Sequence, residues 1–216
     1  MKSVFSEADR ERIRAAVQAA EARCGAELVP AVEPDSDDYE AVPWKLAALL
    51  TLFMLVALMA LHQFTDALLW WPLPLFGLLI LLAGAVGYML PRWSQGIRRR
   101  LIHANRLEFE VDRSAHELFH ELGVSNTTDR MGILLYFSLF ERRLEILPDV
   151  GYHLLTDQQR WQTLVDECTQ FFRANSSVTD AVIASINACA DVVEALNPEG
   201  SKTTNELDDN LRLDED

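Results

Sequence analysis

The sequence predicts an α/β domain that is interrupted by a hairpin of two transmembrane helices. Three observations support this class. Two strands are expected at residues 132–140 and 144–147, amphipathic helices flank them in the chain, and two long apolar runs occupy residues 46–61 and 67–91. Half of the 216 residues are hydrophobic, and they are unevenly distributed. A membrane segment within an otherwise soluble protein accounts for this distribution.

The strand pair is the clearest signal of the fold. Residues 132–140 form a continuous apolar and aromatic run, which is typical of a strand buried on both faces. Residues 144–147 alternate, with Leu144 and Ile146 on one side, which predicts a half-exposed strand. The charged residues 141–143 make a short connection, so we expect an antiparallel hairpin.

A first helix and strand precede the apolar runs. Ser6 and Asp9 have the spacing of a helix N-cap and its partner, and apolar residues at helical spacing then predict a helix over residues 7–24. Residues 27–32 predict a short strand. Pro30 has no N–H for a ladder hydrogen bond, so we expect an edge strand or a bulge. An acidic linker follows at residues 34–45.

Residues 46–91 are too long for one membrane span, since about 20 helical residues cross the hydrocarbon core. The polar residues 62–66 divide them, which predicts two helices and a tight turn. Trp44, Trp70 and Trp71 lie where aromatic residues mark the membrane interface. The alternative is a buried helical hairpin in a soluble protein.

The charges beside these helices predict their orientation. The connection between the two apolar runs has no Lys or Arg. Five arginines follow the second run: Arg92, Arg98, Arg99, Arg100 and Arg106. The positive-inside rule therefore places both termini in the cytoplasm. The start of the chain lacks the apolar core of a signal peptide, which agrees with this orientation. We also expect the arginines to contact anionic lipid headgroups.

Helical periodicity returns after the membrane segment. It predicts one long amphipathic helix over residues 97–122, then a helix capped by Thr156 and Gln159, and a last helix over residues 179–196. The apolar face of the second of these helices consists of Trp161, Leu164, Val165, Cys168, Phe171 and Phe172. The tail, residues 197–216, is acidic and almost free of aromatic residues, so we expect it to be disordered.

Composition excludes some classes of function. The formal charge of −14 argues against nucleic acid as a partner. Cys24, Cys168 and Cys189 are far apart and show no CxxC spacing. Neither a disulfide framework nor a thiolate zinc site is therefore expected, and a reducing compartment fits better.

The sequence His116-Glu117-Leu118-Phe119-His120 matches the HExxH pattern of zinc proteases. On a helix the two histidines share a face and can bind zinc, with Glu117 as the general base. No later pattern offers a third ligand, and the apolar stripe of this helix leaves both histidines on its more exposed side. The alternative is a solvated helix face.

A second candidate site is acidic. Asp129 precedes the buried strand, Asp149 ends the next one, and Asp157 opens the following helix. If the strands are adjacent, the three carboxylates gather at one end of the sheet and suit Ca²⁺ or Mg²⁺. The alternative assigns them to turns and to a first helical turn. No Gly-rich phosphate loop, nucleophile elbow or thiolate–histidine pair is visible, so no catalytic residue is assigned.

Residues 123–157 resemble the TPM domain family. The resemblance rests on an ordered set of residues around the strand pair: Gly123 with Thr127, Arg130-Met131-Gly132-Ile133-Leu134, Arg143 with Glu145, Asp149-Val150-Gly151, and Asp157. It extends over residues 97–196 and includes residues 25–30 as the first strand. The resemblance implies an α/β/α sandwich around a small mixed sheet, with the membrane hairpin inserted after the first strand. Residues 1–33 and 92–196 then form one cytoplasmic unit.

The resemblance also implies functions. Members of the family include photosystem II repair factors and bacterial membrane proteins, some encoded beside LemA-type proteins, which are therefore candidate partners. Some members have been called acid phosphatases and some bind calcium, which makes Asp129, Asp149 and Asp157 the residues carried over. We expect a multi-pass protein of the bacterial inner membrane whose domain is a non-enzymatic accessory or interaction module. A metal-dependent phosphatase and a membrane zinc protease are the alternatives.

Overall fold

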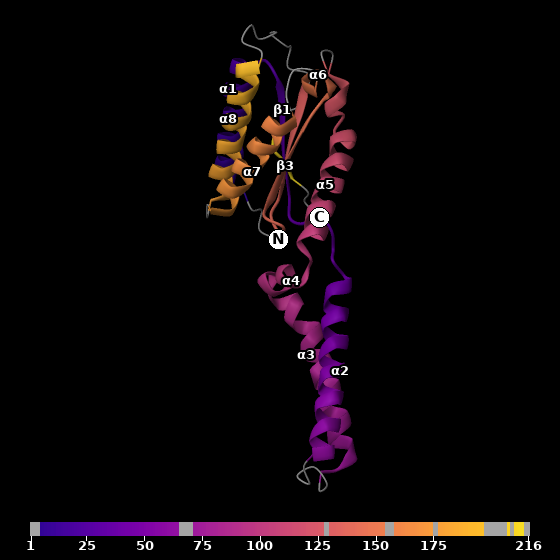
Figure 1. The fold of residues 1–216 in the computed structure, drawn as a ribbon. Coiled ribbons are helices and arrows are strands. Elements are labelled where there is room, and N and C mark those ends of the chain that lie inside the picture. Colours follow the sequence, from indigo (N-terminus) through magenta and orange to yellow (C-terminus); the bar gives the residue numbers. More distant parts are fainter. Residues whose placement is uncertain are drawn as a thin grey trace. The chain divides into compact units, whose positions relative to one another are not determined.

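The computed structural model describes residues 5–64, 71–127, 130–153, 158–174, 177–196, 207 and 210–213 (Figure 1). The chain divides into two compact units. The sandwich unit comprises residues 1–36 and 107–216, and the hairpin unit comprises residues 37–106. The first helix and the first strand thus belong to the same unit as the chain from Leu107 onward, whereas residues 92–106, directly after the second apolar run, belong to the hairpin unit.

A four-stranded mixed sheet forms the centre of the sandwich unit. Its strands are β1 (Glu27–Glu33), β2 (Gly132–Ser138), β3 (Arg143–Pro148) and β4 (Arg212–Leu213), in the order β3-β2-β1-β4. β2 and β3 are antiparallel, as predicted, and β1 runs parallel to β2 along its whole length. Every residue of β2 is buried, whereas β3 is only half-buried, which confirms both strand patterns.

Pro30 is accommodated in β1 without a bulge. The N–H of Glu27 donates to the carbonyl of Met131, so this residue faces β2. Backbone groups alternate in direction along a strand, so Leu28 and Pro30 face away from β2. The Leu28 N–H donates to the Glu21 carboxylate (2.8 Å), and the short strand β4 pairs only with residues beyond Pro30. The missing donor therefore costs no ladder hydrogen bond.

Three helices cover one face of the sheet: α1 (Glu7–Cys24), α7 (Gln158–Ala174) and α8 (Val178–Leu196) (Figure 1). They pack on the strand residues that point to that face, including Leu28, Ile133, Leu135, Phe137, Leu144 and Ile146. The Phe137 and Phe172 rings meet edge to face with centroids 5.7 Å apart. This layer contains the larger of the two hydrophobic cores.

The opposite face is covered by α5 (Ala104–Glu121), whose residues from Leu107 onward belong to this unit (Figure 1). Val111, Ala115 and Phe119 pack there on the other side chains of the strands, such as Leu134 and Tyr136. Helices on both faces of a small mixed sheet make an α/β/α sandwich, as predicted. The 3₁₀ turn Val124–Asn126 and the short helix α6 (Val150–His153) complete this unit.

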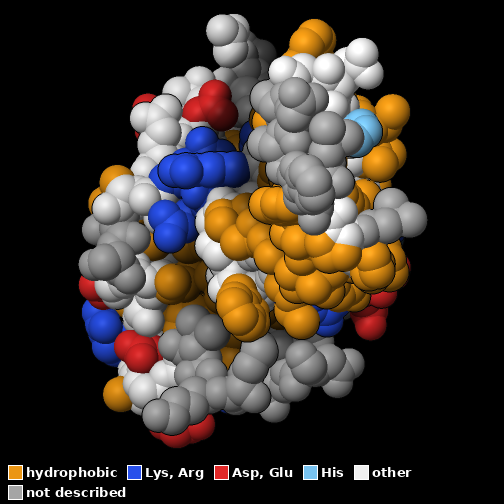
Figure 2. Space-filling model, turned by 90° about the horizontal axis from the view of Figure 1, so that it is seen from below, with side chains coloured by type: hydrophobic (Ala, Val, Ile, Leu, Met, Phe, Trp, Pro, Cys, Tyr) orange, Lys and Arg blue, Asp and Glu red, His pale blue; other side chains and the backbone are white. Residues whose placement is uncertain are grey.

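The hairpin unit contains α2 (Ala41–Phe64), α3 (Leu73–Trp93) and α4 (Gln95–Leu101). Two of its helices are long and apolar enough to span a membrane, over Ala41–Phe64 and Pro74–Trp93. Their large apolar side chains are mostly exposed, and hydrophobic side chains form a broad group in Figure 2. Of the tryptophans expected at the membrane interface, Trp71 is half-exposed. Trp70 lies outside the described residues.

Four expectations about the elements need correction. The single helix expected over residues 97–122 is two helices, because Ile102 is buried and adopts an extended conformation that ends α4. Phe171, expected in the apolar face of α7, is exposed because Phe172 occupies the core position. In the tail, expected to be disordered, Arg212–Leu213 form β4 because the outer edge of β1 offers backbone partners there. Residues 62–64, expected in the turn between the two apolar helices, instead continue α2 to Phe64.

Candidate functional site

Asp149 lies at the end of β3, where the sequence predicted an acidic site. Its side chain is 4% exposed, and its Oδ2 atom is 3.1 Å from the Arg130 Nε atom. The Oδ1 atom accepts a hydrogen bond from the Val150 N–H (2.7 Å). The backbone N–H of Asp149 donates to the Gly132 carbonyl at the start of β2 (2.9 Å). Asp149 therefore joins the end of β3 to the start of β2 through its backbone N–H, and to Arg130 through its carboxylate.

Glycines are required on both sides of this junction. A Cβ atom on Gly132 would overlap the Val124 carbonyl oxygen, and one on Gly151 would overlap the Arg130 carbonyl oxygen. The Gly151 N–H also donates to that Arg130 carbonyl (3.1 Å), and Arg130 itself has a positive φ of 55°. The Arg-x-Gly and Asp-x-Gly spacings are thus explained by close backbone packing and one ion pair.

Asp129 and Asp157 lie outside the described residues. Of the three predicted acidic ligands, the structure therefore locates only Asp149. Within the described ranges, no three His, Cys, Asp or Glu side chains come together in a way that could hold a metal ion. At Asp149 a cation would compete with Arg130 for the Oδ2 atom. This atom accepts no hydrogen bond from the residues described.

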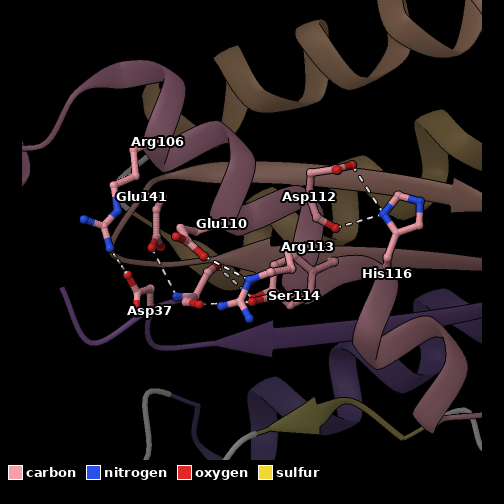
Figure 3. A network of polar contacts seen from close by, with 10 residues as sticks. Asp37, Arg106, Glu110, Asp112, Arg113, Ser114, His116 and Glu141 are labelled. Carbon is pink, nitrogen blue, oxygen red and sulfur yellow. Dashed lines mark hydrogen bonds and ion pairs between the residues drawn. The ribbon is translucent and has the colours of Figure 1, made fainter.

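The HExxH motif lies on the outer side of α5. His116, Glu117 and His120 are all exposed. The His116 Nδ1 atom lies 2.9 Å from the Asp112 carbonyl oxygen and 3.3 Å from its Oδ1 atom (Figure 3). The histidine is thus held by its own helix, one turn back.

Glu145 forms a charged cluster with α5 that no sequence pattern indicates. The pKa of its carboxyl is raised to about 7, first by burial and then by the negative charge of Asp112. His116 and Arg143 act in the opposite direction, while Glu108 adds to the increase. Glu108 also pairs with Arg143 (3.4 Å). Strand alternation predicts that Glu145 and Leu144 lie on opposite faces of β3. Only the position of α5 brings acidic side chains next to Glu145.

A buried polar network lies at the carboxyl ends of β1 and β2. The Tyr136 hydroxyl donates to the Glu33 carboxylate (2.5 Å) and lies 2.9 Å from the Ser36 Oγ atom. Glu141, 3% exposed, accepts from the Ser36 N–H (3.1 Å) and from the Ser138 hydroxyl. Burial raises the pKa of the Tyr136 hydroxyl above its usual range. The phenol therefore stays neutral and acts as a hydrogen-bond donor.

This network is a connection between loops. The Leu139 N–H donates to the Glu33 carbonyl (3.0 Å), and α5 joins through the Ser114 hydroxyl, which donates to the Ser36 carbonyl (3.0 Å). Ser114 and Glu141 are both labelled in Figure 3. The sequence places Glu141 in the charged connection between the two strands. A polar residue between two strands cannot be recognised as buried until the loop that covers it is known.

Comparisons with known proteins agree with this architecture. Residues 95–192 match the TPM domain family. The chain is also similar to the NMR structure of the BA42 protein from the psychrophilic bacterium Bizionia argentinensis, with a TM-score of 0.59 and 13% identity. That match covers 99% of this chain and 98% of the other, and at such low identity it shows the fold alone. No curated protein matches the chain.

Proposed function

We propose that this protein is anchored in a membrane and that its TPM domain is a non-enzymatic accessory or interaction module. The TPM domain is the match at residues 95–192. The proposal has two parts, the anchor and the module. The observation that carries it is the exposed apolar surface of α2 and α3. The geometry around Asp149 supports the second part.

The surface of the hairpin unit suits lipid rather than water. Phe53 is 68% exposed and Leu81 is 72% exposed, and many large apolar neighbours on both helices are also exposed. Soluble monomers rarely expose apolar patches larger than a few hundred Å². Helices of 24 and 20 residues are long enough to cross the hydrocarbon core, and they satisfy their own backbone hydrogen bonds there.

The orientation follows from charge. Arg98, Arg99 and Arg100 lie on α4, directly after the second helix, and Arg92 lies in the last turn of that helix. The positive-inside rule favours a cytoplasmic position for this flank. Because two spans return the chain to the side on which it started, both termini are then cytoplasmic. Because the family includes bacterial membrane proteins, the membrane we propose is a bacterial inner membrane. Partner proteins at that membrane, including LemA-type proteins, are part of the proposal.

The role of Asp149 favours a module without catalysis. A general acid, base or metal ligand must present free oxygen atoms to a substrate or an ion. In Asp149 one oxygen accepts a hydrogen bond from a backbone N–H and the other is paired with Arg130. The glycines nearby pack so closely on backbone that no side chain fits at their positions. Divalent cation binding at this end of the sheet is retained as a subordinate proposal, because Asp129 precedes β2 and Asp157 follows β3 in the sequence.

The anchor is tested with the full-length protein. We expect it to stay in the membrane fraction through an alkaline wash that removes peripheral proteins. A C-terminal reporter active only in the cytoplasm should be active. Release by the wash contradicts the anchor, and an exported reporter contradicts the orientation.

The module is tested by activity and metal content. The purified full-length protein should hydrolyse phosphomonoesters no faster than the Asp149→Asn variant, with or without Ca²⁺ or Mg²⁺. Metal-dependent turnover that is lost in the variant supports the phosphatase alternative. Stoichiometric zinc that is lost in His116→Ala supports the protease alternative. A protein that co-purifies from membranes in both wild type and Asp149→Asn supports the accessory role.

A further inference from the structure

A cleft of about 340 Å³ lies at the base of the hairpin, entirely within the hairpin unit. Its walls come from the first turns of α2, the end of α4 and the start of α5. Five lining side chains are apolar and three are basic: Val42, Leu46, Leu49, Leu101 and Ile102, and then Lys45, His103 and Arg106. The cleft is therefore amphipathic: it offers five apolar side chains, called the floor below, to hydrocarbon and three basic side chains, called the rim, to negative charge.

The basic rim has charge available for a ligand. Lys45 makes no ion pair with any residue that the structure describes and is exposed. Arg106 is held by Asp37 (2.9 Å), and its guanidinium lies over the Tyr39 ring, 5.6 Å from the centroid. The Arg98 guanidinium lies over the same ring. These contacts keep Arg106 at the rim, while Lys45 remains free to move toward an anion.

The aromatic residues beside the cleft place it at the membrane interface. Trp44 and Tyr88 rings lie 4.9 Å apart, and Arg92 donates to the Tyr88 hydroxyl (3.1 Å). Tryptophan and tyrosine mark the level of the headgroups. Lys45 is next to Trp44, and Leu49 lies about 6 Å further along the helix, at 1.5 Å per residue. The cleft therefore extends from headgroup level toward the hydrocarbon.

We propose that this cleft binds one anionic phospholipid. Its phosphate contacts Lys45 and His103, and the upper part of one acyl chain lies over Leu46 and Leu49. The inference rests on the proposed membrane anchor. A soluble phosphate would use only the rim, whereas a phospholipid also covers the apolar floor, which continues onto the exposed surface of α2. A zwitterionic lipid fits the floor but adds no net negative charge at the rim.

The test uses full-length protein in detergent with phosphatidylglycerol or phosphatidylcholine of the same acyl chains, and native mass spectrometry to count retained lipids. We expect one phosphatidylglycerol to be retained about fivefold more than phosphatidylcholine, the preference typical of one lysine near a membrane surface. Lys45→Glu should abolish this preference, and Lys45→Gln should reduce it. Arg100→Glu is the matched control, because Arg100 is exposed on α4 and does not line the cleft.

Each outcome decides the proposal. Preference lost in Lys45→Glu and kept in Arg100→Glu supports the cleft. Equal retention of both lipids overturns it, and so does an equal loss in both variants, which indicates a diffuse attraction to the arginines. The alkaline wash separates these outcomes from failure of the anchor. Protein that stays in the membrane but shows no lipid preference contradicts only the cleft.

Discussion

The two units of this chain treat apolar side chains in opposite ways. In the sandwich unit, Leu135 and its neighbours on β2 are 0% exposed, because helices cover both faces of the sheet. In the hairpin unit, Leu81 is 72% exposed, although it lies in a helix apolar enough to span a membrane. The chain itself supplies the apolar environment of the first unit. The proposed bilayer supplies that of the second.

Glycine has a similar packing role in both units. In the sandwich, Gly132 and Gly151 let loop backbones approach the ends of two strands. In the hairpin, a Cβ on Gly87 would lie 2.8 Å from the Ala47 Cα atom of the facing helix. Small residues that let helix backbones approach are typical of membrane helix pairs. Close packing is thus common to both units, while the means of burial differs.

The largest expected effect comes from placing a charge in each environment. Leu135→Asp buries a carboxylate in an apolar core and should cost more than about 4 kcal/mol, enough to prevent folding of the sandwich. Leu81→Asp, at the middle of α3, should cost about 2.5–3.5 kcal/mol of membrane insertion. We expect loss of the cooperative thermal transition for the first and loss from the alkali-washed membrane fraction for the second.

The contrast between the two units is tested only when Leu135→Asp and Leu81→Asp are measured side by side. If Leu81→Asp remains fully in the membrane, or lowers the thermal transition of the sandwich as much as Leu135→Asp does, the hairpin is a packed part of a soluble protein. The contrast between the units would then be wrong.

A smaller effect is expected from adding a methyl group between the hairpin helices. Gly87→Ala meets the backbone of α2 and should destabilise the helix pair by about 1–3 kcal/mol, measured by loss of helical structure during titration with SDS. Gly77→Ala is the matched control on the same helix, because a Cβ there meets nothing within 4 Å. Equal midpoints for the two variants would contradict the close packing of α2 on α3.

The smallest effect concerns Glu145, whose carboxyl has its pKa raised from 4.5 to about 7. The folded state binds this proton more tightly than the unfolded state. The stability that this proton contributes is therefore full below pH 4.5 and is lost as pH rises to about 7. Glu145→Gln should remove this loss and raise the free energy of unfolding at pH 8 by about 1–2 kcal/mol after solvent screening.

The measurement is denaturant unfolding of both proteins between pH 4.5 and pH 8. Asp112, Glu108, His116 and Arg143 face Glu145, so Asp112→Asn should lower the pKa of Glu145 and weaken the same pH dependence. Parallel stability profiles for wild type and Glu145→Gln would show that the carboxyl is already ionised in the fold.

Local signals in the sequence were sufficient for most elements. Ser6 and Asp9 form the predicted capping box, and Gly25 ends α1 with a positive φ of 68°. The strand pair and α8 are confirmed within a residue or two, because their patterns depend only on neighbours in the chain. The break at Ile102 was missed, since the apolar spacing is continuous across it and its burial depends on residues distant in sequence.

The candidate sites show where the sequence stops being sufficient. Composition and periodicity determined the α/β class, the two apolar helices and the position of Asp149 at the end of β3. The sequence could not show that Asp149 faces Arg130, that Glu145 faces α5, or that Glu141 is buried. The charge state of a carboxyl depends on the groups that surround it in space. Only tertiary structure brings those groups together, and it also forms the cleft at Lys45.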